Sequence, residues 1–360
     1  MPERLSMGGV DFSQAPFILF WELTRSCALA CRHCRAEAQP RRHHEELTQE
    51  EGYRLLDQIK ALGTPLLVFT GGDPMMRPDL LSLIDYATQQ GLRVSLAPAA
   101  TRLLTTQVLS QLKQAGLARL SISLDGPSSQ VHDAFRATPG SFQRTVEALE
   151  RVVDVGLSLQ INTTVSRFNI AELAELEAVV TSFKPALWDF FFLVPTGRGR
   201  VDEVISPQEH EQVFLWLLEL SRRAPFDIKT TAGQHYRRVV LQRQPVAVAA
   251  SGPGFSSDGI GRAQGVNDGN GCCFISHIGE VYPSGFMPIA VGNVRRTPLA
   301  QIYQDSLVFR ELRDSEKLKG KCGYCDYNRI CGGSRARAYA ITGDYLEAEP
   351  YCVYQPAQRD

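Results

Sequence analysis

The chain has 360 residues, of which 44% are hydrophobic, enough to bury the core of two domains or of one large domain. Its 38 lysines and arginines nearly balance its 39 aspartates and glutamates, which excludes an overall charge that would favour nucleic acid or an anionic membrane as a partner. Because no apolar run is long enough to span a bilayer and the first residues lack the pattern of a secretion signal, we expect a cytoplasmic protein.

The first two hundred residues alternate short apolar runs, typical of buried strands, with helical stretches that mostly end at glycine. The six predicted strands cover residues 17–23, 65–70, 92–97, 117–124, 157–165 and 187–194. The predicted helices that follow the first five strands cover residues 48–63, 78–90, 106–115, 141–155 and 170–183. Strands joined by helices indicate a parallel sheet, and six strand–helix units fit an α/β fold of the partial (β/α)6 TIM-barrel type.

The pattern changes after residue 199. Another helix opens at Ser206, residues 224–270 are predicted to be irregular, and the glycine-rich stretch 251–271 is typical of a linker or a lid. The remaining residues hold six cysteines and little periodicity, as expected of a small domain organised by metal. We therefore expect three parts, namely a barrel core in residues 1–205, a helical and glycine-rich bridge in residues 206–270, and a cysteine-rich domain in residues 271–360.

The nine cysteines are clustered at the two ends of the chain, which in a cytoplasmic protein indicates metal or redox chemistry rather than disulfides. Cys27, Cys31 and Cys34 follow the first predicted strand with C-x3-C-x2-C spacing. Four thiolates close an iron–sulfur site, so three suggest a cluster with one iron left open. Part of a zinc site, or buried thiols without a role, are the alternatives.

The segment from Cys27 to Cys34, with His33 before the last cysteine, resembles the signature loop of the radical S-adenosylmethionine (SAM) enzymes. The resemblance implies a [4Fe-4S] cluster whose open iron binds SAM, and whose reduction releases a 5′-deoxyadenosyl radical. It also implies a partial barrel and an electron donor such as flavodoxin or ferredoxin. The residues that would act on the substrate itself remain unassigned at this point.

Ligand-binding groups of such barrels collect at the carboxyl ends of the strands. Gly71, Gly72 and Asp73 follow the second predicted strand and resemble the Gly-Gly-Glu-Pro element of the family, with aspartate in place of glutamate. The resemblance implies that this segment binds the SAM amino group, and the glycines allow its backbone to approach a ligand closely. An ordinary turn is the alternative. One departure is visible at residues 96–101, where relatives often have Thr-Asn-Gly in contact with SAM and this chain has Leu-Ala-Pro-Ala-Ala-Thr. The resemblance therefore does not extend to that contact.

Polar residues also mark the fourth predicted strand. Ser121, Ser123 and Asp125 alternate and therefore share one face, where polar groups need a polar partner. The resemblance implies that Ser123 and Asp125 lie near the SAM ribose and that Arg136 pairs with the SAM carboxylate. An Asp-Gly-Pro turn is the alternative. Asn162 on the fifth strand is a further candidate for SAM contact, as is the loop at residues 195–199 after the sixth strand.

The C-terminal cysteines Cys322, Cys325, Cys331 and Cys352 resemble the auxiliary-cluster (SPASM) domain of many radical SAM enzymes. The resemblance implies one auxiliary [4Fe-4S] cluster held by these four thiolates. A structural zinc ion with the same four ligands is the alternative.

A second auxiliary cluster would need cysteines that this chain lacks, since Ser284 stands at one such position and Ser334 and Arg335 at the place of another. Cys272 and Cys273 are the cysteines that remain. We expect them to be core thiols, with a substrate or metal contact by one of them as the alternative.

The sequence around Cys331–Asp344 and Glu349–Cys352 resembles a tetrapyrrole-modifying branch, which includes the decarboxylase that converts iron-coproporphyrin to haem. The resemblance implies an oxidoreductase or lyase of haem biosynthesis, whose radical removes hydrogen from a propionate before carbon dioxide leaves. Arg335 and Arg337 are candidates to pair with propionates, or else belong to a solvated helix face. A peptide maturase is the rival, disfavoured because only about sixteen residues precede the first strand and leave no room for a leader-binding domain. A non-catalytic iron–sulfur protein is the third hypothesis.

Overall fold

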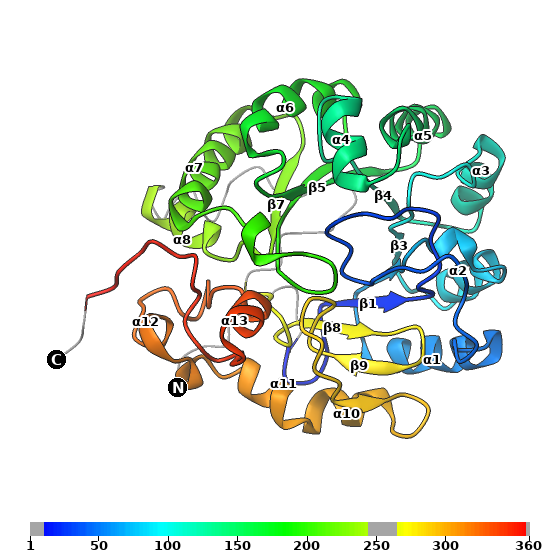
Figure 1. The fold of residues 1–360 in the computed structure, drawn as a ribbon. Helices are drawn as coiled ribbons and strands as arrows, with labels where there is room; N and C mark the ends of the chain where they lie inside the picture. The colour runs from blue at the N-terminus through cyan, green and yellow to red at the C-terminus, as the bar shows by residue number, and fades with distance from the viewer. Residues whose placement is uncertain (1–10, 244–264, 358–360) are drawn as a thin grey trace.

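A computed structural model of the chain describes residues 11–243 and 265–357. In these ranges one sheet runs through the molecule, with the strand order β10-β9-β8-β1-β2-β3-β4-β5-β6-β7 (Figure 1). The strands are β1 Ile18–Glu22, β2 Leu66–Thr70, β3 Val94–Leu96, β4 Arg119–Ser123, β5 Leu159–Val165, β6 Leu187–Phe192, β7 Asp227–Thr231, β8 Cys272–Ile275, β9 Glu280–Tyr282 and β10 Gly292–Asn293.

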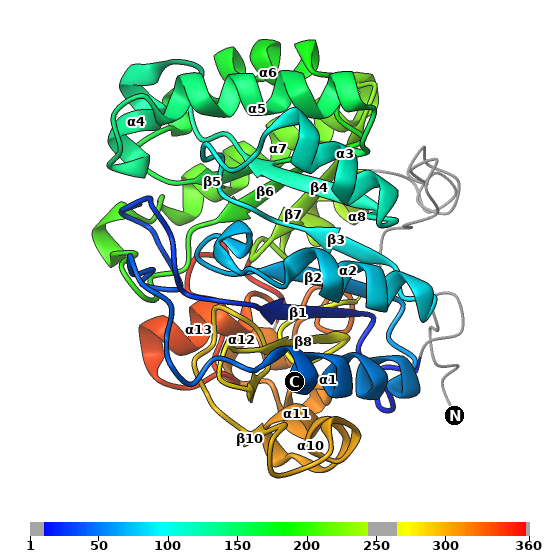
Figure 2. The same cartoon turned by 90° about the vertical axis from the view of Figure 1, so that its right-hand side faces the viewer.

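Helices follow most strands and pack on the outer side of this sheet (Figures 1 and 2). The longer ones are α1 Gln49–Leu62, α2 Leu80–Gln89, α3 Thr106–Gln114, α4 Ser129–Arg136, α5 Ser141–Val155, α6 Leu173–Ser182, α7 Pro207–Arg223 and α8 Tyr236–Arg243. The C-terminal part contains α10 Leu299–Asp305, α11 Leu307–Leu312, α12 Gly320–Gly323 and α13 Arg335–Thr342. Short 3-10 helices are η1 Pro74–Met76, η2 Ile170–Glu172, η3 Val201–Glu203 and η4 Ser315–Lys317.

The six predicted strands are confirmed as β1 to β6, which are consecutive neighbours in one parallel sheet. The expected partial barrel is therefore present. Two strands that the sequence did not predict extend it, because β7 pairs parallel with β6 and β8 pairs parallel with β1. The expectation that residues 224–270 are irregular is wrong for β7 and α8. The predicted linker or lid at 251–271 lies largely outside the described residues.

The two faces of the sheet differ in chemistry, because side chains alternate along each strand. On the outer face, Trp21, Phe69 and Phe190 are fully buried in the core that the helices complete. On the inner face a polar row crosses four strands. Its members are aligned by the register of the sheet and are Ser123, Asn162, Asp189 and Lys229. The inside of the barrel is thus suited to a polar ligand rather than to a closed apolar core.

The C-terminal segment lies on the side of the sheet away from α3 to α6 (Figures 1 and 2). Its helix α13 contacts both ends of the parallel part of the sheet. Arg337 donates from Nη1 to the carbonyl of Ala232, just after β7, at 2.8 Å. The backbone N–H of Ala336 donates to Asp268 Oδ2, shortly before β8, at 2.9 Å. The cysteine-rich part therefore bridges the gap between β7 and β8. None of the helices in the described ranges is long and apolar enough to cross a membrane.

Candidate active site

The loop after β1 presents Cys27, Cys31 and Cys34 beside the carboxyl ends of the parallel strands. Cys27 and Cys31 are buried, and Cys34 is half-buried. Backbone amides donate to two of the sulfurs, from Leu29 to Cys27 Sγ at 3.3 Å and from Ala38 to Cys34 Sγ at 3.4 Å. Such N–H donors stabilise thiolates, which are the form that binds iron.

The environment of Cys27 suits a thiolate that is bound to iron. Burial, with smaller contributions from Asp73, Cys31 and Cys34, raises the pKa of the Cys27 thiol to about 12. The N–H of Leu29, which donates to this sulfur, acts in the opposite direction. The thiolate therefore needs a strong positive charge beside it, which iron provides. In the described part of the chain, no three His, Cys, Asp or Glu side chains are placed to hold a single metal ion.

Gly71 and Gly72 pack directly under the cysteine loop. A Cβ on Gly71 would lie 2.5 Å from the carbonyl oxygen of Thr24, and one on Gly72 would lie 2.6 Å from those of Arg25 and Ser26. The N–H of Gly72 donates to the Thr24 carbonyl at 2.8 Å. The close approach that the sequence predicts for these glycines is thus made to the cysteine loop itself. A contact of this segment with SAM stays a prediction.

Asp73 forms hydrogen bonds with the loop after β3. Its carboxylate accepts the N–H of Met75 at 3.1 Å, the N–H of Ala99 at 3.3 Å and the hydroxyl of Thr101 at 3.0 Å. Burial raises the pKa of Asp73 to about 6, although these three donors act in the opposite direction. Residues 96–101, which depart from the family pattern, therefore supply two of the hydrogen-bond donors to Asp73.

Asp125 and Arg136 form a buried pair next to the cysteine loop. Arg136 donates from Nε to Asp125 Oδ2 at 2.7 Å, and its Nη1 lies 3.7 Å from Cys31 Sγ. The N–H of Thr164 donates to Asp125 Oδ1 at 2.8 Å. Burial alone would raise the pKa of Asp125, but the charge of Arg136, together with His33, His132 and the N–H of Thr164, outweighs burial and lowers the pKa. The structure thus brings Cys31, Asp125 and Arg136 together, and the contacts of Asp125 and Arg136 with SAM stay predictions.

Ser123 and Asn162 lie on the inner face of β4 and β5. They are neighbours in the register of the sheet, and both are half-buried. The amide oxygen of Asn162 accepts a hydrogen bond from Gln160 Nε2 at 2.7 Å. These two side chains are therefore placed to face a ligand in the barrel, and their contact with SAM stays a prediction.

Two further side chains lie beside the cysteine loop: Glu22, which was not predicted, and Arg198, which was predicted only as part of the candidate loop at residues 195–199. Glu22 at the end of β1 is fully buried and binds Arg25, Arg35 and His277, which outweigh burial and lower its pKa to about 2. Arg198 donates its N–H to the Cys34 carbonyl at 3.1 Å, and its Nε and Nη2 are buried without a partner. In the sequence, the feature that could have pointed to Glu22 is its position directly after an apolar run. For Arg198 only its place after the sixth strand pointed to the site.

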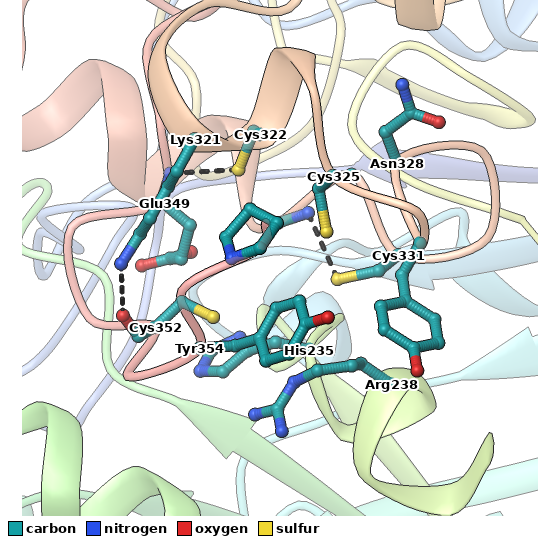
Figure 3. A pocket seen from close by; sticks show the side chains of 14 residues that line it. His235, Arg238, Lys321, Cys322, Cys325, Asn328, Cys331, Glu349, Cys352 and Tyr354 are labelled. Carbon is teal, nitrogen blue, oxygen red and sulfur yellow. Dashed lines mark hydrogen bonds between the residues drawn. The ribbon is translucent and has the colours of Figure 1, made fainter. Parts of the chain in front are cut away.

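The four C-terminal cysteines line one pocket, and their binding of a cluster stays a prediction (Figure 3). Amides donate to two sulfurs, from Gly333 to Cys331 at 3.4 Å and from Glu349 to Cys322 at 3.3 Å. Burial, with smaller contributions from the nearby Cys352 and Cys322, raises the pKa of the Cys331 thiol to about 12. Four thiols gathered in one pocket fit a closed iron–sulfur site.

Glu349 organises the chain around this pocket. Its Oε2 accepts the N–H of Ser334 at 2.8 Å, and its Oε1 accepts the N–H of Tyr351 at 3.1 Å. These two amides belong to the segments that carry Cys331 and Cys352. One buried carboxylate thereby fixes the relative positions of two predicted ligands.

The two arginines of α13 do not form a solvated face, because Arg335 and Arg337 are 2% and 0% exposed. Arg335 donates to the carbonyls of Tyr345 at 3.2 Å and Glu347 at 2.6 Å. Arg337 is bound to the carbonyl of Ala232. The prediction that these arginines pair with propionates is therefore wrong for this structure, in which they hold backbone segments together.

Cys272 and Cys273 are neighbours on β8 and point to opposite faces of the sheet. Cys273 is fully buried in the outer apolar core, as expected of a structural thiol. Cys272 is on the inner face, where burial raises the pKa of its thiol well above the ordinary value. Ser284, which stands where a second auxiliary cluster would need a cysteine, accepts the N–H of Phe286 at 3.3 Å.

A three-thiol loop at the mouth of an open parallel barrel, with a four-thiol pocket against the same barrel, is the arrangement expected of an iron–sulfur protein. Comparison with known proteins gives the family. Residues 21–178 match the Radical SAM superfamily, and residues 267–326 match the SPASM iron-sulfur cluster-binding domain. The chain belongs to the radical SAM superfamily.

Two similar proteins are AdoMet-dependent heme synthases. That of Methanosarcina barkeri is 39% identical over 97% of this chain and 100% of the relative, and that of Nitratidesulfovibrio vulgaris is 42% identical over 96% and 94%. The mycofactocin maturase MftC of Mycobacterium tuberculosis is 31% identical over 94% and 83%. Among solved structures, Streptococcus suis SuiB bound to S-adenosylmethionine shares the fold, with a TM-score of 0.72 at 15% identity over 95% of this chain and 78% of that one.

Proposed function

We propose that this protein is a radical SAM haem synthase, which oxidatively decarboxylates propionate side chains of iron-coproporphyrin. The observation that carries the proposal is the similarity of nearly the whole chain to two AdoMet-dependent heme synthases, at 39% and 42% identity. The mycofactocin maturase is more distant, at 31% identity. Peptide maturation is therefore the alternative that the experiments below must exclude.

In this proposal Cys27, Cys31 and Cys34 hold a [4Fe-4S] cluster. When bound, the cluster and SAM supply a 5′-deoxyadenosyl radical that can remove hydrogen from a carbon atom. Arg136 is held in place by Asp125 beside Cys31, which favours its binding of the SAM carboxylate. The other residues that we propose contact SAM are those predicted from the sequence, namely Gly71, Gly72, Asp73, Ser123, Asp125 and Asn162.

We further propose one auxiliary [4Fe-4S] cluster, held by Cys322, Cys325, Cys331 and Cys352. The decarboxylation is balanced only with an electron acceptor. A propionate that has lost one hydrogen atom gives a vinyl group and carbon dioxide when one electron leaves. An auxiliary cluster is an acceptor of this kind, and α13 places the four-cysteine pocket against the end of the barrel. An electron donor such as flavodoxin or ferredoxin would reduce the first cluster.

The inner face of the barrel supports a substrate that carries carboxylates. Lys229 on β7 faces the interior, and its Nζ lies 2.7 Å from Asp189 Oδ2 and 3.2 Å from Thr231 Oγ1. Its side chain keeps 45% of its exposure, so it remains accessible to a ligand. Arg35 lies 4.6 Å over the ring of Phe274 on the neighbouring inner face of β8. Cationic and aromatic groups together suit a propionate-bearing macrocycle.

The proposal is tested with anaerobically reconstituted protein. We expect about eight irons per chain and, with reductant and SAM, 5′-deoxyadenosine together with conversion of iron-coproporphyrin to haem by mass spectrometry. Cys31→Ser should abolish 5′-deoxyadenosine, whereas Cys273→Ala, in the apolar core, should retain it. Four irons with a zinc ion would contradict the auxiliary cluster. Unchanged iron-coproporphyrin, with turnover of a small peptide, would favour the maturase.

A further inference from the structure

The four-cysteine pocket has a fifth conspicuous member that comes from the barrel rather than from the cysteine-rich segment. His235 precedes α8 and lines the pocket together with Cys322, Cys325, Cys331 and Cys352 (Figure 3). The side chain is 1% exposed, yet neither ring nitrogen has a hydrogen-bond partner. A buried imidazole without partners costs free energy, so a group that belongs in the pocket is the expected partner.

The surroundings of His235 leave few other partners. Its ring packs edge-on against Phe214 of α7, with 4.5 Å between ring centroids, and lies 5.5 Å from the ring of His210. Both neighbours are buried on the barrel side. His210 differs because its Nδ1 lies 2.9 Å from the carbonyl of Ser206. The nitrogens of His235 are therefore available to the pocket, where the sulfurs lie.

We propose that His235 donates a hydrogen bond from its ring N–H to a sulfur atom of the auxiliary cluster and thereby raises the reduction potential of that cluster. The inference rests on the auxiliary cluster proposed above. All four irons already have thiolate ligands from the chain, so the imidazole is left as a donor rather than as a ligand. It is a positioning residue, because its effect reaches the substrate only through the cluster.

The direction of the effect follows from charge. Reduction adds a negative charge to the cluster, and an N–H donor to sulfur stabilises the more negative state. Positive groups already stand beside the same thiols, since Arg335 Nη2 lies 3.9 Å from Cys322 Sγ and Lys321 donates to the Cys352 carbonyl. His235 would add the partial positive charge of its ring N–H from the barrel side of the pocket. The combined effect makes the auxiliary cluster a better electron acceptor, as the decarboxylation requires.

The test is an EPR-monitored redox titration of full-length protein in which Cys27, Cys31 and Cys34 are all alanine, so that only the auxiliary cluster contributes. His235→Leu should lower the midpoint potential, with the equilibrium constant for reduction falling about tenfold, which is 59 mV for one electron. His235→Gln, which keeps an N–H donor, should recover part of the difference. His210→Leu is the matched control, equally buried but not lining the pocket, and should leave the potential unchanged. An unchanged potential in His235→Leu would overturn the proposal.

A second readout does not depend on the leucine variant holding its cluster. Pulsed EPR of protein labelled with ¹⁵N-histidine should show one weakly coupled histidine nitrogen at the reduced cluster, present in His210→Leu and absent in His235→Gln. No coupling in the unmutated pocket, or a coupling strong enough for direct iron ligation, would overturn the hydrogen bond. Absence of any auxiliary iron in wild-type protein would overturn both proposals, whereas a loaded cluster without the coupling would overturn only the role of His235.

Discussion

Arg337 and Glu349 form an ion pair inside the protein, with 3.5 Å between Arg337 Nε and Glu349 Oε1 and almost no exposure of either side chain. Arg337 also holds the carbonyl of Ala232 at the end of β7, while Glu349 holds the segments of Cys331 and Cys352 through the amides of Ser334 and Tyr351. The pair thus joins the barrel to the four-cysteine pocket.

Glu349→Gln should therefore weaken both stability and cluster binding. The change leaves the guanidinium of Arg337 buried without its counter-charge, which costs about 3–5 kcal/mol in typical proteins. We expect a lower free energy of unfolding in urea and a loss of about four of about eight irons. Glu219→Gln removes an exposed ion pair with Arg222 and should change neither quantity. Full iron content in Glu349→Gln would show that the carboxylate does not position the ligands.

Gly72→Ala should disturb the other cysteine loop. The new Cβ would meet the carbonyl oxygens of Arg25 and Ser26 at 2.6 Å, so the loop before Cys27 must move. We expect iron analysis to show about four irons, with the auxiliary cluster retained and 5′-deoxyadenosine release lost. Gly63→Ala is the control, because Gly63 has a positive φ of 78° but nothing within 4 Å of a Cβ. It should cost about 1 kcal/mol of stability and leave all the iron in place.

Glu22 should make the stability of the protein depend on acid pH. Its pKa is about 2 in the folded chain, against 4.5 when free, so the folded state prefers the carboxylate. The stabilisation is present above pH 4.5 and is lost as the pH falls from 4.5 towards 2, and at 1.36 kcal/mol per unit it is about 3 kcal/mol.

Glu22→Gln removes this titration. Unfolding of cluster-free wild type and variant should therefore differ most at neutral pH, with the difference shrinking below pH 4.5. A difference that stays constant from pH 7 to pH 2.5 would mean that the charge of Glu22 is not what Arg35 and His277 stabilise.

The six central strands could be predicted because each is an apolar run followed by a helix with a recognisable end. Thr48 and Glu51, for example, form a capping box at the start of α1, where a predicted helix begins. Strand β7 was missed because Asp227-Ile-Lys-Thr-Thr contains one apolar residue, and a strand with a polar inner face has no apolar pattern to reveal it. Strand β8 was missed because its two cysteines were considered only as thiols.

The cysteine ligands were predictable from spacing, whereas their supporting residues were not. Arg335 and Arg337 resemble a solvated helix face in the sequence, since nothing local shows that their partners are backbone carbonyls up to 105 residues away. His235 likewise gives no signal, because it approaches the four-cysteine pocket from the barrel, 87 or more residues before its cysteines. Long-range contacts of this kind depend on how α13 bridges β7 and β8.

The polar row inside the barrel leads to a prediction about the substrate. Lys229 lies on the inner face of β7 beside Asp189 and keeps 45% of its side-chain exposure. If iron-coproporphyrin binds inside the barrel, a propionate can take over part of the interaction that Asp189 makes with Lys229. Lys229→Gln should then raise the KM for iron-coproporphyrin about tenfold, which is about 1.4 kcal/mol of binding.

Steady-state haem formation, measured together with 5′-deoxyadenosine released in the absence of porphyrin, separates this effect from a general defect. Lys229→Gln should raise the KM for iron-coproporphyrin and leave the release of 5′-deoxyadenosine unchanged, because the hydrogen bonds of Lys229 go to Asp189 and Thr231 and not to the cysteine loop. Lys317→Gln is the control, since that lysine has 46% side-chain exposure and pairs with Glu311 outside the barrel. An unchanged KM in Lys229→Gln would place the propionates elsewhere, with Arg35 over Phe274 as the next cation to replace.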